Sequence, residues 1–219
     1  SPGLRPLGSP LLTAFLLRQA GMEPVLHMNC RNRNRVALQG ELLGAATAGI
    51  SALLLRRNIP MRVGRVARKH AVFDIGAREL IAAARRIRDA DPPSRYGLAQ
   101  APDFFIGAAA TVFDATAAWQ PKSLLAKLDN GVQWVQTQLC MDLPLLQSYM
   151  RRFVAARLTH RAYLVVTIAP LLSVESLRRL RTNVRGALIP DQIVMRLEQA
   201  RDSEQTGVQI CAEMLHELA

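Results

Sequence analysis

Short apolar runs alternate along the chain with longer segments in which apolar residues recur at helical spacing. The apolar runs cover residues 23–29, 51–55, 104–110, 132–138 and 163–169. Nearly continuous apolar runs of this length are typical of parallel strands that are buried on both faces. Because parallel strands need crossover connections, usually helices, the alternation predicts an α/β fold with five parallel strands.

Helical periodicity marks most of the segments between and around these runs. The expected helices cover residues 10–20, 38–49, 77–87, 145–154, 190–200 and 207–218. Asp142 is the expected N-cap of the fourth helix, and Pro144 would lie in its first turn. Gly21, Gly49 and Gly131 each fall between a helix and the next strand, where a residue with positive φ is commonly needed.

The pattern alone leaves the arrangement of the strands open. An open five-stranded sheet with helices on both faces is one alternative, and a parallel (β/α)8 TIM-type barrel is the other. The helix expected at residues 10–20 has no strand before it, and the helices expected after residue 190 have none after them. Either sheet would therefore have edges that need cover.

Composition narrows the class of protein. The chain has 219 residues, half of them apolar, which is enough for one sizeable buried core. The longest apolar stretches without charge, residues 42–55 and 162–174, are shorter than the roughly 20 residues of a membrane span. Cys30, Cys140 and Cys211 are far apart and form no CxxC pair, so we expect neither disulfides nor a metal site, and a cytoplasmic location.

A strong positive charge raises the question of anionic partners. Lys and Arg number 28 against 17 Asp and Glu, a formal net charge of +11. Aromatic residues make up only 5% of the chain, and no nucleic-acid-binding motif interleaves with the basic clusters. Phosphorylated cofactors or solvated helix faces explain the charge, so nucleic acid is not the partner we expect, although the basic segment 56–72 leaves that alternative open.

Polar residues gather where the first predicted strand ends. The stretch from His27 to Gln39 includes Arg31, Arg33 and Arg35, and the carboxyl ends of strands form the catalytic face of an α/β barrel. His27 is either a ligand-binding side chain or a core histidine bonded to the backbone. The arginines are either functional or a solvated helix start.

Residues 23–35 resemble the third-strand motif of the methylenetetrahydrofolate reductase family, H-x-T-C followed in bacterial members by RDRNR and ALQSELLGA. Residues 104–110, 135–138 and 184–191 agree with later family segments in order and spacing. The resemblance runs from about residue 9 to residue 218. It implies that residues 1–219 form a single TIM-type barrel domain whose first and last strands are absent from this sequence.

The resemblance also implies an activity. Members of this family reduce 5,10-methylenetetrahydrofolate to 5-methyltetrahydrofolate in one-carbon metabolism, with NADH or NADPH as reductant and FAD as bound cofactor. The implied partner is the folate substrate, and the resemblance leaves a homo-oligomer open. The family's proton-donating glutamate lies on the absent first strand, so no catalytic residue is assigned in this chain.

Five positions are implied to hold the flavin. His27 matches a histidine that contacts FAD, and Arg56 and Asn58 fall in the family's L-x-G-D segment. Ala109 lies where the strand approaches the flavin, and Lys127 matches a basic residue near the cofactor phosphates.

One position is implied to hold the substrate. Gln138, at the end of the segment Gln136-Thr137-Gln138, matches the glutamine associated with the folate pterin. Its amide offers both an acceptor and donors. The alternative is a strand-end amide that caps a neighbouring loop.

Departures from the family motif motivate a second hypothesis. Arg57 and Asn58 stand where the family has Gly and Asp, and Thr111 and Val112 replace a tyrosine or asparagine and a proline. Loss of the glycine restricts close backbone approach. The second hypothesis is a flavin-poor or non-catalytic relative that binds folate or a partner protein.

Overall fold

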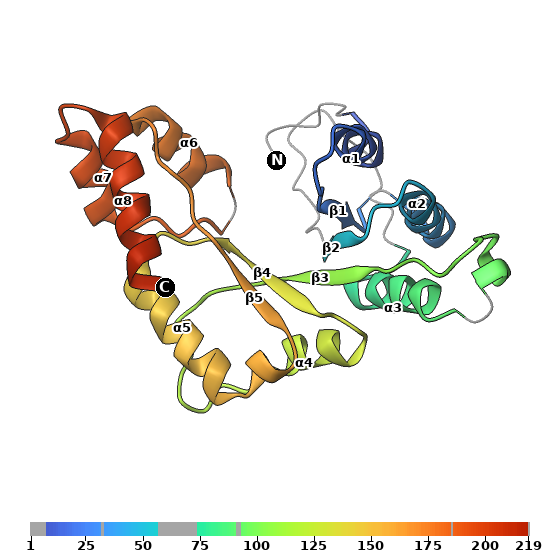
Figure 1. Ribbon diagram of the computed structural model, residues 1–219. Coiled ribbons are helices and arrows are strands. Elements are labelled where there is room, and N and C mark those ends of the chain that lie inside the picture. The colour runs from blue at the N-terminus through green and yellow to red at the C-terminus, as the bar shows by residue number, and fades with distance from the viewer. Residues whose placement is uncertain (1–7, 32, 57–73, 91–92, 185, 219) are drawn as a thin grey trace, which may run out of the picture. The chain divides into compact units, whose positions relative to one another are not determined.

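The computed structural model describes residues 8–31, 33–56, 74–90, 93–184 and 186–218 (Figure 1). Its five strands form one parallel sheet and confirm the five predicted from the apolar runs. They are β1 Leu26–Asn29, β2 Ala52–Arg56, β3 Phe105–Ala110, β4 Trp134–Leu139 and β5 Tyr163–Thr167.

Helices surround and connect the strands, and all six that the periodicity predicts are confirmed. The helices are α1 Pro10–Gln19, α2 Arg35–Thr47, α3 Ala77–Arg88, α4 Lys122–Asp129, α5 Leu143–Ala155, α6 Val174–Asn183, α7 Asp191–Glu198 and α8 Ser203–Leu218, with the 3-10 turns η1 Pro93–Tyr96 and η2 Leu158–His160. The periodicity does not predict α4 or α6. The helix α4 has only eight residues, and α6 is mostly polar with only Leu177 fully buried.

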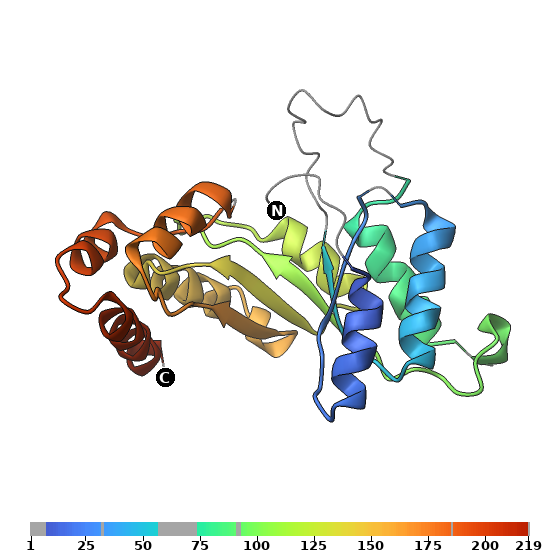
Figure 2. The ribbon, with the colours of Figure 1, turned by 90° about the horizontal axis from the view of Figure 1, so that it is seen from above.

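The strand order decides between the two sheet arrangements. The strands are neighbours in chain order, β1-β2-β3-β4-β5, whereas a doubly wound sheet reverses its order at a switch point. Right-handed crossovers that all step in one direction place their helices on one face. Accordingly α1 contacts α2, α2 contacts α3 and α3 contacts α4, and the first three lie side by side next to the strands (Figure 2). The fold is an incomplete TIM-type barrel.

Local sequence signals set several helix boundaries. The Asp142 carboxylate accepts a hydrogen bond from the Leu145 backbone N–H at 3.0 Å, which confirms the predicted N-cap of α5. Gly21, Gly49 and Gly131 have φ of 81°, 68° and 103°, as predicted, and each ends a helix before a strand.

The described chain divides into two compact units. We call Leu7–Ala109 with Lys122–Val135 the amino-terminal unit, and Ala110–Pro121 with Gln136–Ala219 the carboxy-terminal unit. Strands β3 and β4 each contribute residues to both. That residues 1–219 form a single barrel domain stays a prediction.

In the amino-terminal unit the core lies between the strands and the helices α2 and α3. Its fully buried side chains include Leu26, Met28, Leu38, Leu42, Leu53, Leu55, Leu80, Ile81 and Ile106. On the opposite face of β3, Gly107 packs under the indole of Trp134. A Cβ on Gly107 would lie 2.1 Å from Trp134 Cε2, so this close approach requires glycine.

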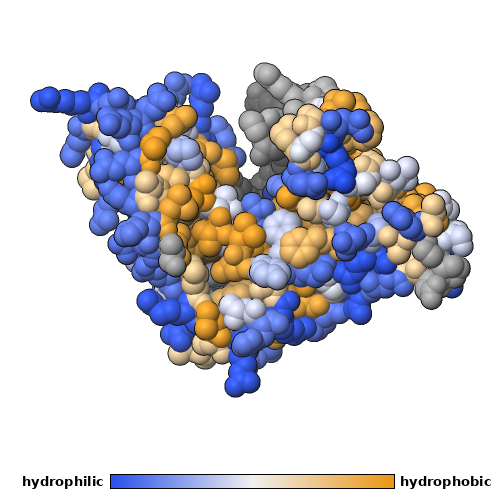
Figure 3. All heavy atoms as spheres, in the orientation of Figure 1, coloured by the Kyte–Doolittle hydropathy of each residue, from blue (hydrophilic) through white to orange (hydrophobic). Residues whose placement is uncertain are grey.

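In the carboxy-terminal unit one apolar cluster joins β4 to the last three helices. It contains Leu139, Met141, Leu171, Leu177, Ile189, Leu197, Ile210 and Met214. The strand β5 instead leaves apolar side chains exposed, with Tyr163 72% and Val165 42% accessible, and apolar residues gather there on the surface (Figure 3). None of the helices in the described ranges combines the length and apolar character that a membrane span requires.

Candidate functional site

The carboxyl ends of β1, β2 and β3 bring together four of the predicted site residues. His27 pairs in register with Leu54, and Asn29 pairs with Arg56. Leu55 pairs with Ala108, so the same register places Ala109 level with Arg56. Because alternate residues of a strand share a face, His27, Asn29, Arg56 and Ala109 lie on one face of the sheet. We call this group, together with Lys127, the strand-end cluster.

His27 is exposed on this face, so the core-histidine alternative is wrong. Partial desolvation by the surrounding protein lowers the pKa of His27 from its ordinary value, and the positive charge of Arg56 lowers it further. The imidazole is therefore neutral at neutral pH. A neutral imidazole offers a ligand one donor and one acceptor.

Lys127 projects from α4 to the end of β3. Its Nζ donates a hydrogen bond to the Ala109 carbonyl oxygen at 2.7 Å. Burial lowers the pKa of the Lys127 ammonium group. An ammonium group has three N–H donors, so two remain for a ligand beside the small, half-buried Ala109.

The segment after β1 is fixed by its own hydrogen bonds. The Asn29 carbonyl Oδ1 accepts from the Arg31 backbone N–H at 3.1 Å, and Asn34 Oδ1 accepts from the Ala37 N–H at 2.8 Å to cap α2. Arg33 forms an ion pair with Glu41 of α2. The solvated alternative therefore holds for the exposed Arg35 but not for Arg33.

Sequence reasoning did not select Asn29, although it lies within the quoted motif. The signal for it is positional, because Asn29 follows His27 by two residues and so shares its face. Asn58 and the rest of the basic segment after Arg56 lie outside the described residues. Arg56 itself is exposed at the end of β2.

Gln138, in the carboxy-terminal unit, binds the backbone of Val112 with both ends of its amide. Its Oε1 accepts from the Val112 N–H at 2.8 Å, and its Nε2 donates to the Val112 carbonyl at 3.0 Å. This is the loop-capping contact that we considered for Gln138. One amide N–H and one lone pair remain, so its role toward a pterin stays a prediction.

The loop after β3 is further anchored by an aromatic cluster that sequence reasoning missed. Phe113 and Trp119 of the loop stack edge to face with centroids 5.6 Å apart, and Trp119 lies 5.6 Å from the buried Tyr149 of α5. Arg152 of α5 donates from Nε to the Ala115 carbonyl at 3.2 Å. Burial raises the pKa of Tyr149 to about 12. The loop that Gln138 holds is thus preformed.

We compared the chain with curated proteins and with solved structures. The comparison with curated proteins gives no match. Among solved structures, an uncharacterized protein from Clostridium thermocellum, described as binding two copies of 5-methyl-5,6,7,8-tetrahydrofolic acid, has the same fold with a TM-score of 0.55 and 11% identity. The alignment covers 89% of this chain and 59% of that one.

The family is established by a longer match. The family model described as methylenetetrahydrofolate reductase matches residues 7–219, nearly the whole chain. The matched range includes both the strand-end cluster and Gln138. The chain belongs to the methylenetetrahydrofolate reductase family.

Proposed function

We propose that this chain is the cofactor- and folate-binding barrel of an oxidoreductase that reduces 5,10-methylenetetrahydrofolate to 5-methyltetrahydrofolate with NADH or NADPH. The observation that carries the proposal is the strand-end cluster, in a chain whose family match spans residues 7–219. Catalytic and cofactor groups of barrel enzymes lie at this end of the strands. The similar Clostridium thermocellum structure, described as binding a methylated tetrahydrofolate, supports the folate assignment.

The chemistry of the strand-end cluster suits FAD. Arg56 and Lys127 supply cationic donors for a pyrophosphate, and His27 supplies a neutral ring with a donor and an acceptor. Ala109 has the small side chain that close approach of a flat ring requires. When bound, FAD supplies the transfer of hydride from nicotinamide to folate.

The residues of this chain would position the ligands rather than carry the redox step. Lys127 is held at the end of β3 by its bond to Ala109, so its charge is directed before any ligand arrives. Gln138 keeps Val112 and its loop in place and has one N–H and one lone pair free for the pterin edge. Such preorganisation lowers the entropic cost of binding.

Two substitutions test the assignment of the two ligands. We expect Gln138→Ala to weaken 5-methyltetrahydrofolate binding about tenfold and FAD binding much less, since about one hydrogen-bonded contact is lost. We expect His27→Ala to do the reverse. Both affinities are measured by isothermal titration calorimetry, with the exposed Gln192→Ala on α7 as control. Negligible effects of both variants on both ligands would contradict the assignment.

A second candidate function rests on the departures at the flavin positions. Arg57 and Asn58 replace the family's Gly and Asp, and Gln138 uses two of its hydrogen bonds internally. These features favour a flavin-poor relative that binds folate or a partner protein without turnover. Such a protein would bind 5-methyltetrahydrofolate but give no NADH- or NADPH-dependent reduction of an added electron acceptor in the presence of FAD.

A further inference from the structure

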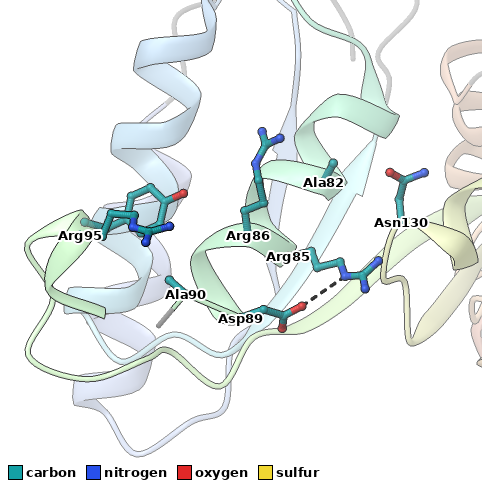
Figure 4. Close-up of a pocket in the computed structure, with 8 residues that line it drawn as sticks. Ala82, Arg85, Arg86, Asp89, Ala90, Arg95 and Asn130 are labelled. Carbon is teal, nitrogen blue, oxygen red and sulfur yellow. Dashed lines mark hydrogen bonds and ion pairs between the residues drawn. The ribbon is translucent and has the colours of Figure 1, made fainter. Parts of the chain in front are cut away.

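A polar cavity lies in the amino-terminal unit, around the carboxyl end of α3. We call it the arginine pocket, and it has a volume of about 480 Å³. Figure 4 shows α3 between η1, which carries Arg95, and the turn after α4, which carries Asn130. Its lining consists of Ala82, Arg85, Arg86, Asp89, Ala90, Arg95, Tyr96 and Asn130.

The arginine pocket is separate from the strand-end cluster. Arg88, next to the pocket on α3, donates to Gln133 Oε1 at 2.9 Å, and the same oxygen accepts from the Ile106 N–H at 3.0 Å. Gln133 and Ile106 lie at the amino ends of β4 and β3. Ala109 and Lys127 meet at the carboxyl end of β3. In barrel enzymes the amino-terminal face is the non-catalytic one, so the proposed function does not account for this pocket.

One arginine of the pocket is fixed and neutralised. Arg85 donates from Nε to Asp89 Oδ2 at 3.2 Å and from Nη1 to the Asp129 carbonyl at 3.0 Å. Hydrogen bonding by Arg88, opposed in part by desolvation, and bonding by Arg85 lower the pKa of Asp89, so this carboxylate is ionised at neutral pH. The Arg85 guanidinium is therefore held in place at one side of the pocket.

Two other arginines keep their charge available. Arg86 and Arg95 are exposed, and neither makes an ion pair or side-chain hydrogen bond with any residue in the described ranges. Figure 4 shows Arg86 directed away from the Arg85–Asp89 ion pair. Among the described lining residues, three guanidinium groups stand against one carboxylate, a formal charge of +2. Planar guanidinium donors match phosphate oxygens.

The remaining lining suits a flat ring beside that charge. Tyr96 is half-buried and follows Arg95, while Ala82 and Ala90 are too small to fill the cavity. Asn130 donates from Nδ2 to the Ala126 carbonyl at 2.7 Å, which leaves its Oδ1 as an acceptor. Pockets of about 300–1,000 Å³ hold ligands the size of a single nucleotide.

We propose that the arginine pocket binds a mononucleotide, whose phosphate contacts Arg86 and Arg95 and whose base packs on Tyr96. A pocket with two available cations suits one phosphate group. A nucleic-acid strand instead requires a basic groove that follows several phosphates.

The test titrates the full chain with AMP and, separately, with inorganic phosphate by isothermal titration calorimetry. We expect saturable AMP binding that the double variant Arg86→Gln/Arg95→Gln weakens at least tenfold. Arg78→Gln, an exposed α3 arginine outside the lining, should change it less than twofold. Tyr96→Leu should weaken AMP binding and leave phosphate binding unchanged. Thermal unfolding by circular dichroism checks that each variant is folded.

Four results would overturn the proposal. The first is the absence of saturable AMP binding. The second is an equal loss in Arg78→Gln, which would show only the general positive field. The third is loss of AMP binding in Arg56→Gln but not in the double variant, which would assign AMP to the strand-end cluster. The fourth is binding of single-stranded DNA through Arg86 and Arg95 without competition by AMP.

Discussion

Gly107 shows how one position in a strand can determine a local structure. Its backbone lies against the Trp134 indole, and the indole Nε1 donates to the Phe105 carbonyl at 3.2 Å. Any side chain at Gly107 would displace an aromatic ring that is only 5% exposed. The packing of Trp134 on β3 therefore depends on the absence of a side chain at Gly107.

Gly107→Ala should lower the free energy of unfolding by about 1–3 kcal/mol, the usual cost of overpacking. Gly40→Ala is the matched control, because a Cβ at Gly40 meets nothing within 4 Å and alanine favours the helix α2 by about 0.5–1 kcal/mol. Urea denaturation measures the free energy of unfolding of both variants. Equal stability of Gly107→Ala and the wild type would refute the close packing.

The titration of His27 tests the strand-end cluster directly. NMR should give His27 a pKa below the ordinary 6.5, and Arg56→Gln should raise that pKa without restoring 6.5, because desolvation is the larger cause. The folded state then takes up a proton less readily than the unfolded state. Stability is therefore fully present above pH 6.5 and decreases as the pH falls below it.

His27→Gln should remove that part of the pH dependence. An unchanged His27 pKa in Arg56→Gln would show that the two side chains do not interact. A His27 pKa above 6.5 would mean that an acidic partner, rather than Arg56, dominates its surroundings.

At the residue scale, the sequence predicted the positions of the candidate site residues more successfully than it predicted their contacts. The position of His27 at a strand end followed from the apolar run before it. The local pattern could not decide between burial and exposure, because exposure depends on the neighbouring strand β2. The two bonds between Gln138 and Val112 join residues 26 positions apart, and no local spacing encodes such a contact.

At the element scale, caps and glycines set the boundaries. Asp142 satisfies a backbone N–H in the first turn of α5, and Pro144 occupies a position whose missing N–H costs nothing. This helix carries Tyr149, which holds the loop after β3. The cap therefore supports the loop that Gln138 also fixes.

Asp142→Ala should cost about 1 kcal/mol of unfolding free energy, whereas Asp142→Ser, which keeps a capping oxygen, should cost much less. Guanidinium denaturation of both variants measures the difference. If the two variants lose the same stability, the carboxylate acts through something other than the cap.

The helical and strand periodicities predicted most of the helices and all five strands. The order of the strands in the sheet became known only from the structure. Apolar runs identify a strand but not its neighbours, so both a barrel and a doubly wound sheet fitted the sequence. The helices α4 and α6 escaped prediction. In α6 only Leu177 is fully buried, and Val174 and Leu180 are partly buried against the same cluster. A helix with so narrow an apolar stripe carries little periodic signal.

At the scale of the whole molecule, part of the positive charge is balanced by ion pairs. In the carboxy-terminal unit, Arg178 pairs with Glu198, Arg179 with Glu175, Arg181 with Asp191 and Arg196 with Glu213. Exposed pairs of this kind contribute little stability each. They do show that these four arginines of the last helices are balanced by carboxylates.

The central claim, that this family member holds a flavin at the strand-end cluster, is tested most directly by visible absorption. The purified chain is incubated with FAD and desalted. The claim predicts that the bands of oxidised flavin remain with the protein, bleach on anaerobic addition of NADH or NADPH, and return on addition of 5,10-methylenetetrahydrofolate. A folded protein that emerges colourless after incubation with FAD would contradict it.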